Sequence, residues 1–142
     1  MIPRSTVPKG DATLVELSRA DCLRLLATGA VGRVVFTDRA LPAAHPVTYL
    51  LDQEEIVFRT ASGAKVAAAS LRNIVAFQVD QIDVDTHRGW SVLGIGEAYE
   101  IADPERLVTL TPRMPQPWSS GAVNGHVIGI PLQRLTGRQL GP

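Results

Sequence analysis

The stretch VGRVVFTDRALPAAHPVTYLLDQEEIVFRT (residues 31–60) decides the fold class, because three strand-like runs follow one another with almost no sequence between them. The runs VGRVVFT (31–37), PAAHPVTYLLD (42–52) and EIVFRT (55–60) are rich in apolar residues and bounded by turn formers. Only DRAL and DQE connect them. A parallel pair of strands needs a long crossover, so connectors this short predict antiparallel hairpins.

Three more strand-like runs and three helical segments complete the pattern. The runs NIVAFQVDQI (73–82), WSVLGIGEAYEIA (90–102) and NGHVIGIPLQRLTGRQL (124–140) predict strands, whereas residues 18–28, 63–71 and 103–110 predict helices. This order predicts a mainly β domain over residues 14–142, a six-stranded antiparallel barrel with flanking short helices. Residues 1–13, which contain Pro3, Pro8 and Gly10, predict an N-terminal arm.

The first helix has recognisable ends. Ser18 is a good N-cap, and Gly29 is expected to stop the helix in the left-handed conformation. Cys22 lies on the apolar face of this helix, so it is expected to be buried and unreactive.

The composition excludes several classes of protein. A chain of 142 residues with 45% hydrophobic residues and a mean hydropathy of +0.09 is typical of one folded domain rather than a disordered chain. Fourteen basic and 14 acidic residues balance, which argues against a nucleic-acid partner. The sequence has no membrane-spanning apolar run, no signal peptide and one cysteine. We therefore expect a soluble, cytoplasmic protein with no membrane partner.

The best local signal for binding is RTASGAKVAAAS (59–70), where a strand ends and a helix begins. Helix N-termini attract anions, and here Arg59, Thr60, Ser62 and Lys65 supply further N–H and O–H donors. The segment therefore predicts a phosphate site. The alternative interpretation is a simple connector whose hydroxyl side chains cap the helix. The spacing of a Walker loop is absent.

Weaker signals lie on two other strands. Gly94 and Gly96 share one face of their strand, which indicates close approach of a ligand or another backbone, or else a bulge or barrel corner. Trp90 is either a packing or interface residue or a stacking platform. Pro46 indicates an edge strand, a bulge, or backbone offered to a ligand, and His45 beside it is a surface residue or a catalytic one. Asp80, Asp83 and Asp85 predict a solvated hairpin tip, and no histidines have metal-ligand spacing.

The order of these motifs resembles the pyridoxamine 5′-phosphate oxidase-like family of FMN-binding split barrels, especially its short actinobacterial members. The resemblance covers residues 14–140 and rests on LSRADCLRLLATGAVGRVVFTD, LPAAHPVTYLLD, IVFRTASGAKVAAA and GWSVLGIGEAYEI. It implies a split β-barrel, a homodimer with two flavins at the subunit interface, and an oxidoreductase that acts on a small molecule.

The resemblance also implies which residues bind the cofactor. Its phosphate clamp falls on Arg59, Thr60, Ser62, Gly63, Ala64 and Lys65. The strand along the isoalloxazine ring falls on His45, Pro46, Val47 and Thr48, and a polar ring contact falls on Ser91 beside Trp90. Arg138 is the candidate contact from the C-terminal strand. The clamp is one residue shorter than in the oxidases, so a deazaflavin cofactor, or flavin or haem binding without turnover, is the alternative. The catalytic residues and the substrate stay open.

Overall fold

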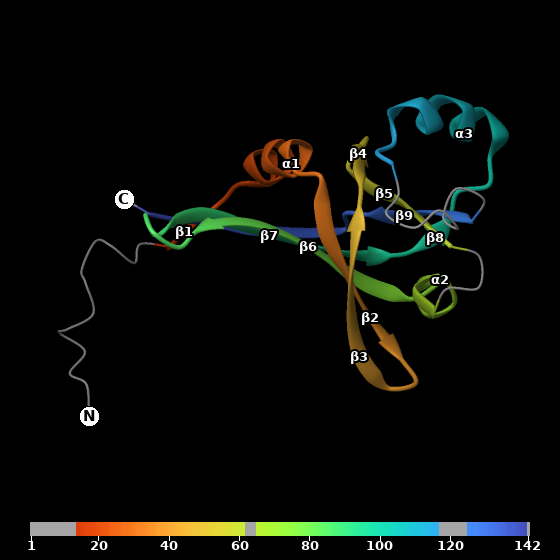
Figure 1. The fold of residues 1–142 in the computed structure, drawn as a ribbon, viewed down its shortest axis with the longest axis horizontal. Helices are drawn as coiled ribbons and strands as arrows, with labels where there is room; N and C mark the ends of the chain where they lie inside the picture. Colours follow the sequence, from red (N-terminus) through yellow and green to blue (C-terminus); the bar gives the residue numbers. More distant parts are fainter. Residues whose placement is uncertain (1–13, 62–64, 117–124, 142) are drawn as a thin grey trace.

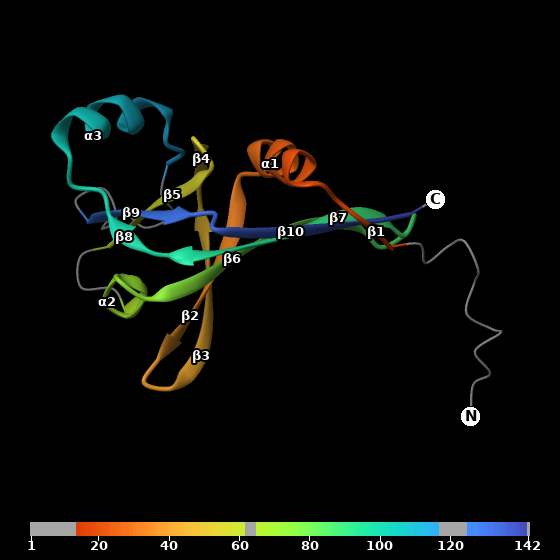
Figure 2. The ribbon, with the colours of Figure 1, turned by 180° about the vertical axis from the view of Figure 1, so that it is seen from behind.

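Two antiparallel sheets build the protein, shown in Figure 1 and from behind in Figure 2. The computed structural model describes residues 14–61, 65–116 and 125–141. The larger sheet has six strands in the order β1-β10-β7-β6-β2-β3, and the smaller has four in the order β4-β5-β9-β8. The six-stranded sheet contains β1 (Leu14–Glu16), β10 (Arg134–Leu140), β7 (Arg88–Glu97), β6 (Ile74–Asp83), β2 (Val31–Asp38) and β3 (Leu41–Thr48); the other contains β4 (Leu50–Asp52), β5 (Glu55–Thr60), β9 (His126–Pro131) and β8 (Tyr99–Glu100).

All six predicted runs form strands, and the mainly β, antiparallel prediction is confirmed. Three of the runs are divided, because each one leaves one sheet and continues in the other. The divisions fall at Tyr49, at Ala98 and at Leu132–Gln133. The short strand β1, which pairs with β10, was not expected from the sequence.

The helices match their predicted positions in the described residues. Helix α1 (Arg19–Thr28) begins after Ser18, whose hydroxyl accepts a hydrogen bond from the Asp21 N–H at 3.1 Å. Helices α2 (Lys65–Ser70) and α3 (Pro104–Leu110) follow, and Asp103 caps α3 as expected. The short 3-10 helix η2 (Thr111–Arg113) continues from α3.

The expected left-handed stop at Gly29 is wrong. Gly29 has φ −85° and ψ 161°, which is extended backbone open to any residue. The position is restricted instead by space, because a Cβ there would collide with the Tyr49 hydroxyl and lie 3.2 Å from Val79.

Helix α1 covers one end of the main core. Cys22 and Leu26 are buried there, and the Tyr49 hydroxyl donates to the Leu26 carbonyl oxygen at 2.6 Å. Burial raises the pKa of Cys22, as expected for an unreactive thiol, and raises the pKa of Tyr49 to about 12.

The molecule has two distinct ends (Figure 1). The β6–β7 hairpin and β1 form one end, whereas α2, α3 and the four-stranded sheet form the other. A second apolar cluster packs under α3 and contains Val57, Ile101, Leu110 and Met114. Within the described ranges, no helix combines the length and hydropathy needed to cross a bilayer.

Candidate functional site

The four residues assigned to the flavin ring lie on β3, at one edge of the six-stranded sheet. This placement confirms the edge-strand interpretation of Pro46. Side chains alternate along the strand, so His45 and Val47 share one face, and Pro46 and Thr48 share the other. His45 is exposed, and its ring makes an edge contact with Phe36 at 5.1 Å between centroids. Val47 packs against the main core.

Arg59 and Thr60 end strand β5, and their side chains point to opposite faces. Thr60 is 4% exposed and donates its hydroxyl to the Ala61 carbonyl oxygen at 3.3 Å. Arg59 lies on the face of Val57, toward α3, and its Nη2 donates to the Thr111 carbonyl oxygen at 3.4 Å. The two side chains therefore do not converge on one point, and Arg59 is the side chain available to an anion beside α3.

The remainder of the predicted clamp is described only in part. Ser62, Gly63 and Ala64 lie outside the described residues. The backbone of Lys65 begins helix α2, as the sequence predicts.

Segment 111–116, which begins with η2, lies beside both predicted contact regions. The Thr111 carbonyl oxygen accepts from Arg59, and the Gln116 carbonyl oxygen accepts from the Thr48 hydroxyl at 3.3 Å. Thr48 belongs to the six-stranded sheet and Arg59 to the four-stranded sheet. The same short segment therefore contacts both the ring strand and the phosphate-binding candidate, one at each of its ends.

Ser91 belongs to a row of polar side chains on the outer face of the six-stranded sheet, the face opposite buried Phe77. Gln78 Nε2 donates to Asp80 Oδ2 at 2.7 Å and to Ser91 Oγ at 3.5 Å. Arg33 Nη1 donates to Gln78 Oε1 at 3.5 Å. Arg138 pairs with Ser91 across β10 and β7, so it lies on this face too.

Gln78 was not among the contacts predicted from the sequence. The signal was present: Gln78 is a polar residue in an apolar strand, two positions from Asp80 and on the same face. Amide, hydroxyl and guanidinium groups in one row offer both donors and acceptors to a ligand.

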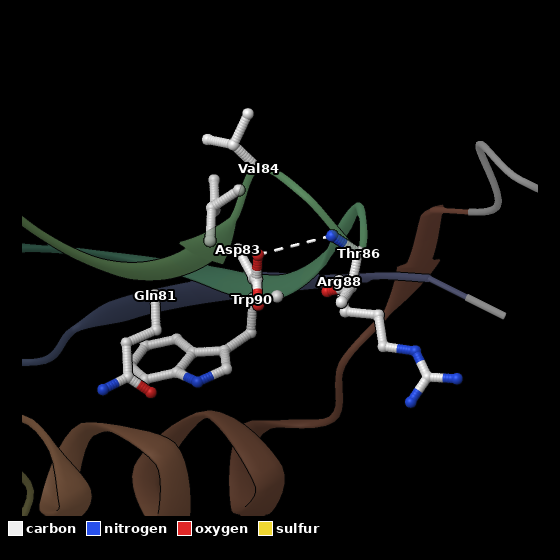
Figure 3. Close-up of a pocket in the computed structure, with 8 residues that line it drawn as sticks. Gln81, Asp83, Val84, Thr86, Arg88 and Trp90 are labelled. Carbon is white, nitrogen blue, oxygen red and sulfur yellow. Dashed lines mark hydrogen bonds between the residues drawn. The ribbon is translucent and has the colours of Figure 1, made fainter.

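Trp90 points away from Ser91. It shares a face with Gln81, its partner in the β6–β7 register, and both lie on the α1 side of the hairpin in Figure 3. Trp90 is half-buried against the main core, which confirms the packing interpretation. The same two side chains also line an open pocket of about 770 Å³ at the hairpin end, together with Ile82, Asp83, Val84, Thr86, Arg88 and Gly89.

The hairpin tip is capped by one of its own side chains. Asp83 Oδ1 accepts from the N–H groups of Asp85 at 2.9 Å and Thr86 at 3.3 Å, as Figure 3 shows for Thr86. In the part of the chain that the structure describes, no three His, Cys, Asp or Glu residues gather as a metal site.

Close packing between the sheets explains the two glycines of β7. A Cβ on Gly96 would collide with the Pro131 carbonyl oxygen, and a Cβ on Gly94 would collide with a methyl of Leu132. The close backbone approach expected from the sequence is therefore real at Gly96, and the neighbour is β9 of this chain.

The residues present fit a phosphorylated, planar ligand. Arg59 is half-buried, forms no ion pair with any described residue, and spends one of its five N–H donors on a carbonyl oxygen. Guanidinium groups in such settings bind phosphate strongly. The edge of β3 leaves backbone groups open for a ring, and the polar row lies on the outer face that β3 shares.

The six-stranded sheet, the second sheet that closes against it and the flanking helices define a split β-barrel. The family model for pyridoxamine 5′-phosphate oxidase matches residues 18–139, which is most of the chain. The chain belongs to the pyridoxamine 5′-phosphate oxidase family.

Known relatives agree with this assignment. The uncharacterized protein Rv0080 of Mycobacterium tuberculosis is 37% identical over 139 residues, covering 94% of this chain and 90% of Rv0080. The structure of an FAD-binding protein from Mycobacterium smegmatis superposes with a TM-score of 0.76 at 28% identity, covering 89% of this chain and 98% of that one. A protein of unknown function from Corynebacterium diphtheriae gives a TM-score of 0.74 at 27% identity, covering 89% and 98%.

Proposed function

We propose that this chain is a flavin-binding oxidoreductase that acts on a small molecule, with FMN as its first candidate cofactor. The observation that carries the proposal is the position of Arg59, half-buried beside α3 and connected to the edge strand β3 through segment 111–116. Arg59 would hold the phosphate, and the backbone of residues 45–48 would line the ring. A bound flavin supplies hydride transfer, so the protein need only bind, orient and exclude water.

FAD is the second candidate, because the 28% identical mycobacterial protein is described as FAD-binding. The deazaflavin cofactor expected as an alternative from the sequence stays a prediction. So does the cytoplasmic location without a nucleic-acid or membrane partner.

We also propose that two copies of the chain associate through the outer face of the six-stranded sheet. Large apolar side chains are exposed there: Leu14 (56%), Val31 (41%), Ile74 (64%), Ile82 (55%) and Leu93 (37%). A face with this much exposed apolar surface is typical of an interface. A second copy seated on it would cover the polar row of Arg33, Gln78, Asp80 and Ser91 and would put these polar groups at the interface.

Fluorescence titration tests the cofactor proposal. Purified protein is titrated with FMN, FAD and riboflavin, and Arg59→Ala is compared with Arg24→Ala, an exposed arginine of α1. We expect saturable quenching of FMN by the wild type. Loss of one charge-assisted bond should weaken FMN binding by about 10-fold or more in Arg59→Ala. Arg24→Ala should bind FMN as the wild type does.

The proposal fails if wild-type protein shows no saturable binding at tens of micromolar of any flavin, a threshold of about −6 kcal/mol. Tighter binding of FAD than of FMN replaces the first candidate by the second.

A further inference from the structure

A network of charged and polar side chains attaches α3 and η2 to the four-stranded sheet. Asp52, which is 12% exposed, accepts from Arg113 Nη1 at 3.0 Å and from Arg106 Nη2 at 3.4 Å. Arg106 Nη2 also donates to Glu55 at 3.1 Å. The Tyr99 hydroxyl hydrogen-bonds to both Arg106 and Glu55. We call these residues the Asp52 network; their members are Asp52, Glu55, Tyr99, Arg106 and Arg113.

Segment 111–116 is held at three points. Arg113 is paired with Asp52, Met114 is buried in the second apolar cluster, and the Gln116 carbonyl oxygen accepts from Thr48. Thr111 is the C-cap of α3, and its carbonyl oxygen accepts from the Met114 N–H at 3.3 Å, which fixes the direction in which the carbonyl points. The Thr111 carbonyl oxygen is the one that accepts from Arg59.

This contact bears on how Arg59 meets an anion. Arginine has many rotamers, and an unrestrained arginine loses this conformational entropy when it binds a ligand. An Arg59 guanidinium already held by Thr111 keeps its other N–H groups for the ligand. The direction of the Arg59 side chain therefore depends on where the Thr111 carbonyl lies. Arg113 is the one charged residue of segment 111–116, and its ion pair with Asp52 ties the segment to the four-stranded sheet.

We propose that Arg113 is a positioning residue for the cofactor site: through Asp52 it fixes segment 111–116, and the segment orients Arg59 toward the cofactor phosphate. This inference rests on the proposed function. It assigns to the Asp52 network a part in phosphate affinity, in addition to holding α3 on the sheet.

The test compares FMN with riboflavin, which lacks the phosphate. Arg113→Gln should weaken FMN binding by about 3- to 10-fold, the cost of re-ordering one long side chain, and leave riboflavin affinity within about twofold. Arg113→Lys, which keeps the charge opposite Asp52, should restore most of the FMN affinity. Arg19→Gln is the matched control, because Arg19 has the same 3.0 Å carboxylate contact and similar exposure but lies on α1.

A double-mutant cycle shows whether the effect passes through Arg59. In an Arg59→Ala background, Arg113→Gln should change FMN affinity no further. Should Arg113→Gln fold poorly, Asp52→Asn removes the same ion pair from the other side, together with the longer pair to Arg106, and should lower the FMN-to-riboflavin affinity ratio at least as much.

The inference is overturned if Arg113→Gln lowers both affinities equally or neither, or if its effect persists in the Arg59→Ala background. Either result is compatible with wild-type FMN binding and leaves the proposed function standing. A wild-type protein that binds no flavin overturns both.

Discussion

Replacing Gly96 by alanine should destabilise the protein far more than the same change at Gly94, two residues away on the same face of β7. A Cβ at Gly96 would lie 3.0 Å from the Pro131 carbonyl carbon and closer still to its oxygen. That carbonyl cannot turn aside, because Pro131 is held in β9 and its oxygen accepts from the Gln133 N–H at 2.9 Å. The backbones of the two sheets must therefore move apart to make room for the Cβ.

Gly94 faces a softer neighbour. Its Cβ would meet a terminal methyl of Leu132, with Leu132 Cγ at 3.8 Å and Leu135 Cδ1 at 3.7 Å, so a rotamer change can relieve the clash. Overpacking against rigid backbone costs about 3 kcal/mol, whereas a rotamer change costs about 1 kcal/mol. Alanine also regains about 0.5 kcal/mol in a strand relative to glycine.

Urea unfolding measures the difference. We expect the free energy of unfolding to fall by about 2–3 kcal/mol in Gly96→Ala and by less than about 1 kcal/mol in Gly94→Ala, with unchanged m-values. If Gly96→Ala matches the wild type, or Gly94→Ala loses as much as Gly96→Ala, close contact between the sheets is not what requires glycine at position 96.

Two further predictions concern pH and association. The native state keeps the Tyr49 proton up to about pH 12, while the unfolded chain loses it near pH 10, so stability should fall as the pH rises between these values, by about 1.4 kcal/mol per unit. Urea unfolding should show the free energy of unfolding of the wild type falling relative to that of Tyr49→Phe over this range. A difference between the two proteins that does not change with pH contradicts the raised pKa of Tyr49. Light scattering should give the wild type twice the 15.3 kDa of one chain, and Leu93→Glu on the outer face should yield monomers, whereas Val108→Glu on α3 should not. A monomeric wild type would refute the association.

Much of the fold could be predicted because it depends on local sequence. Hairpin connectors, helix caps and apolar alternation identified every long strand and all three helices. The points where a strand changes sheet could not be predicted in this way. The division at Leu132, for example, depends on its N–H donating to the Glu54 carbonyl oxygen at 3.1 Å, a partner 78 positions away along the chain.

The candidate site was predicted less completely, for the same reason. Arg59 and the β3 edge follow from local motifs and a family resemblance. The pairing of Arg113 with Asp52 joins residues 61 positions apart, and nothing in either neighbourhood signals the other. The opposite directions of Trp90 and Ser91, in contrast, follow from strand alternation, so only one of them can contact a ligand on the outer face.

The two prolines of β3 have a consequence for how the protein behaves when it is concentrated. Pro42 and Pro46 share one orientation along a strand whose far side has no neighbour, and neither carries an N–H. Prolines occur in sheets where the missing N–H would face outward. An incoming strand from another molecule would therefore find no N–H donor at Pro42 or at Pro46. Strand-to-strand stacking between molecules, the route to fibrils, is thereby disfavoured at the β3 edge.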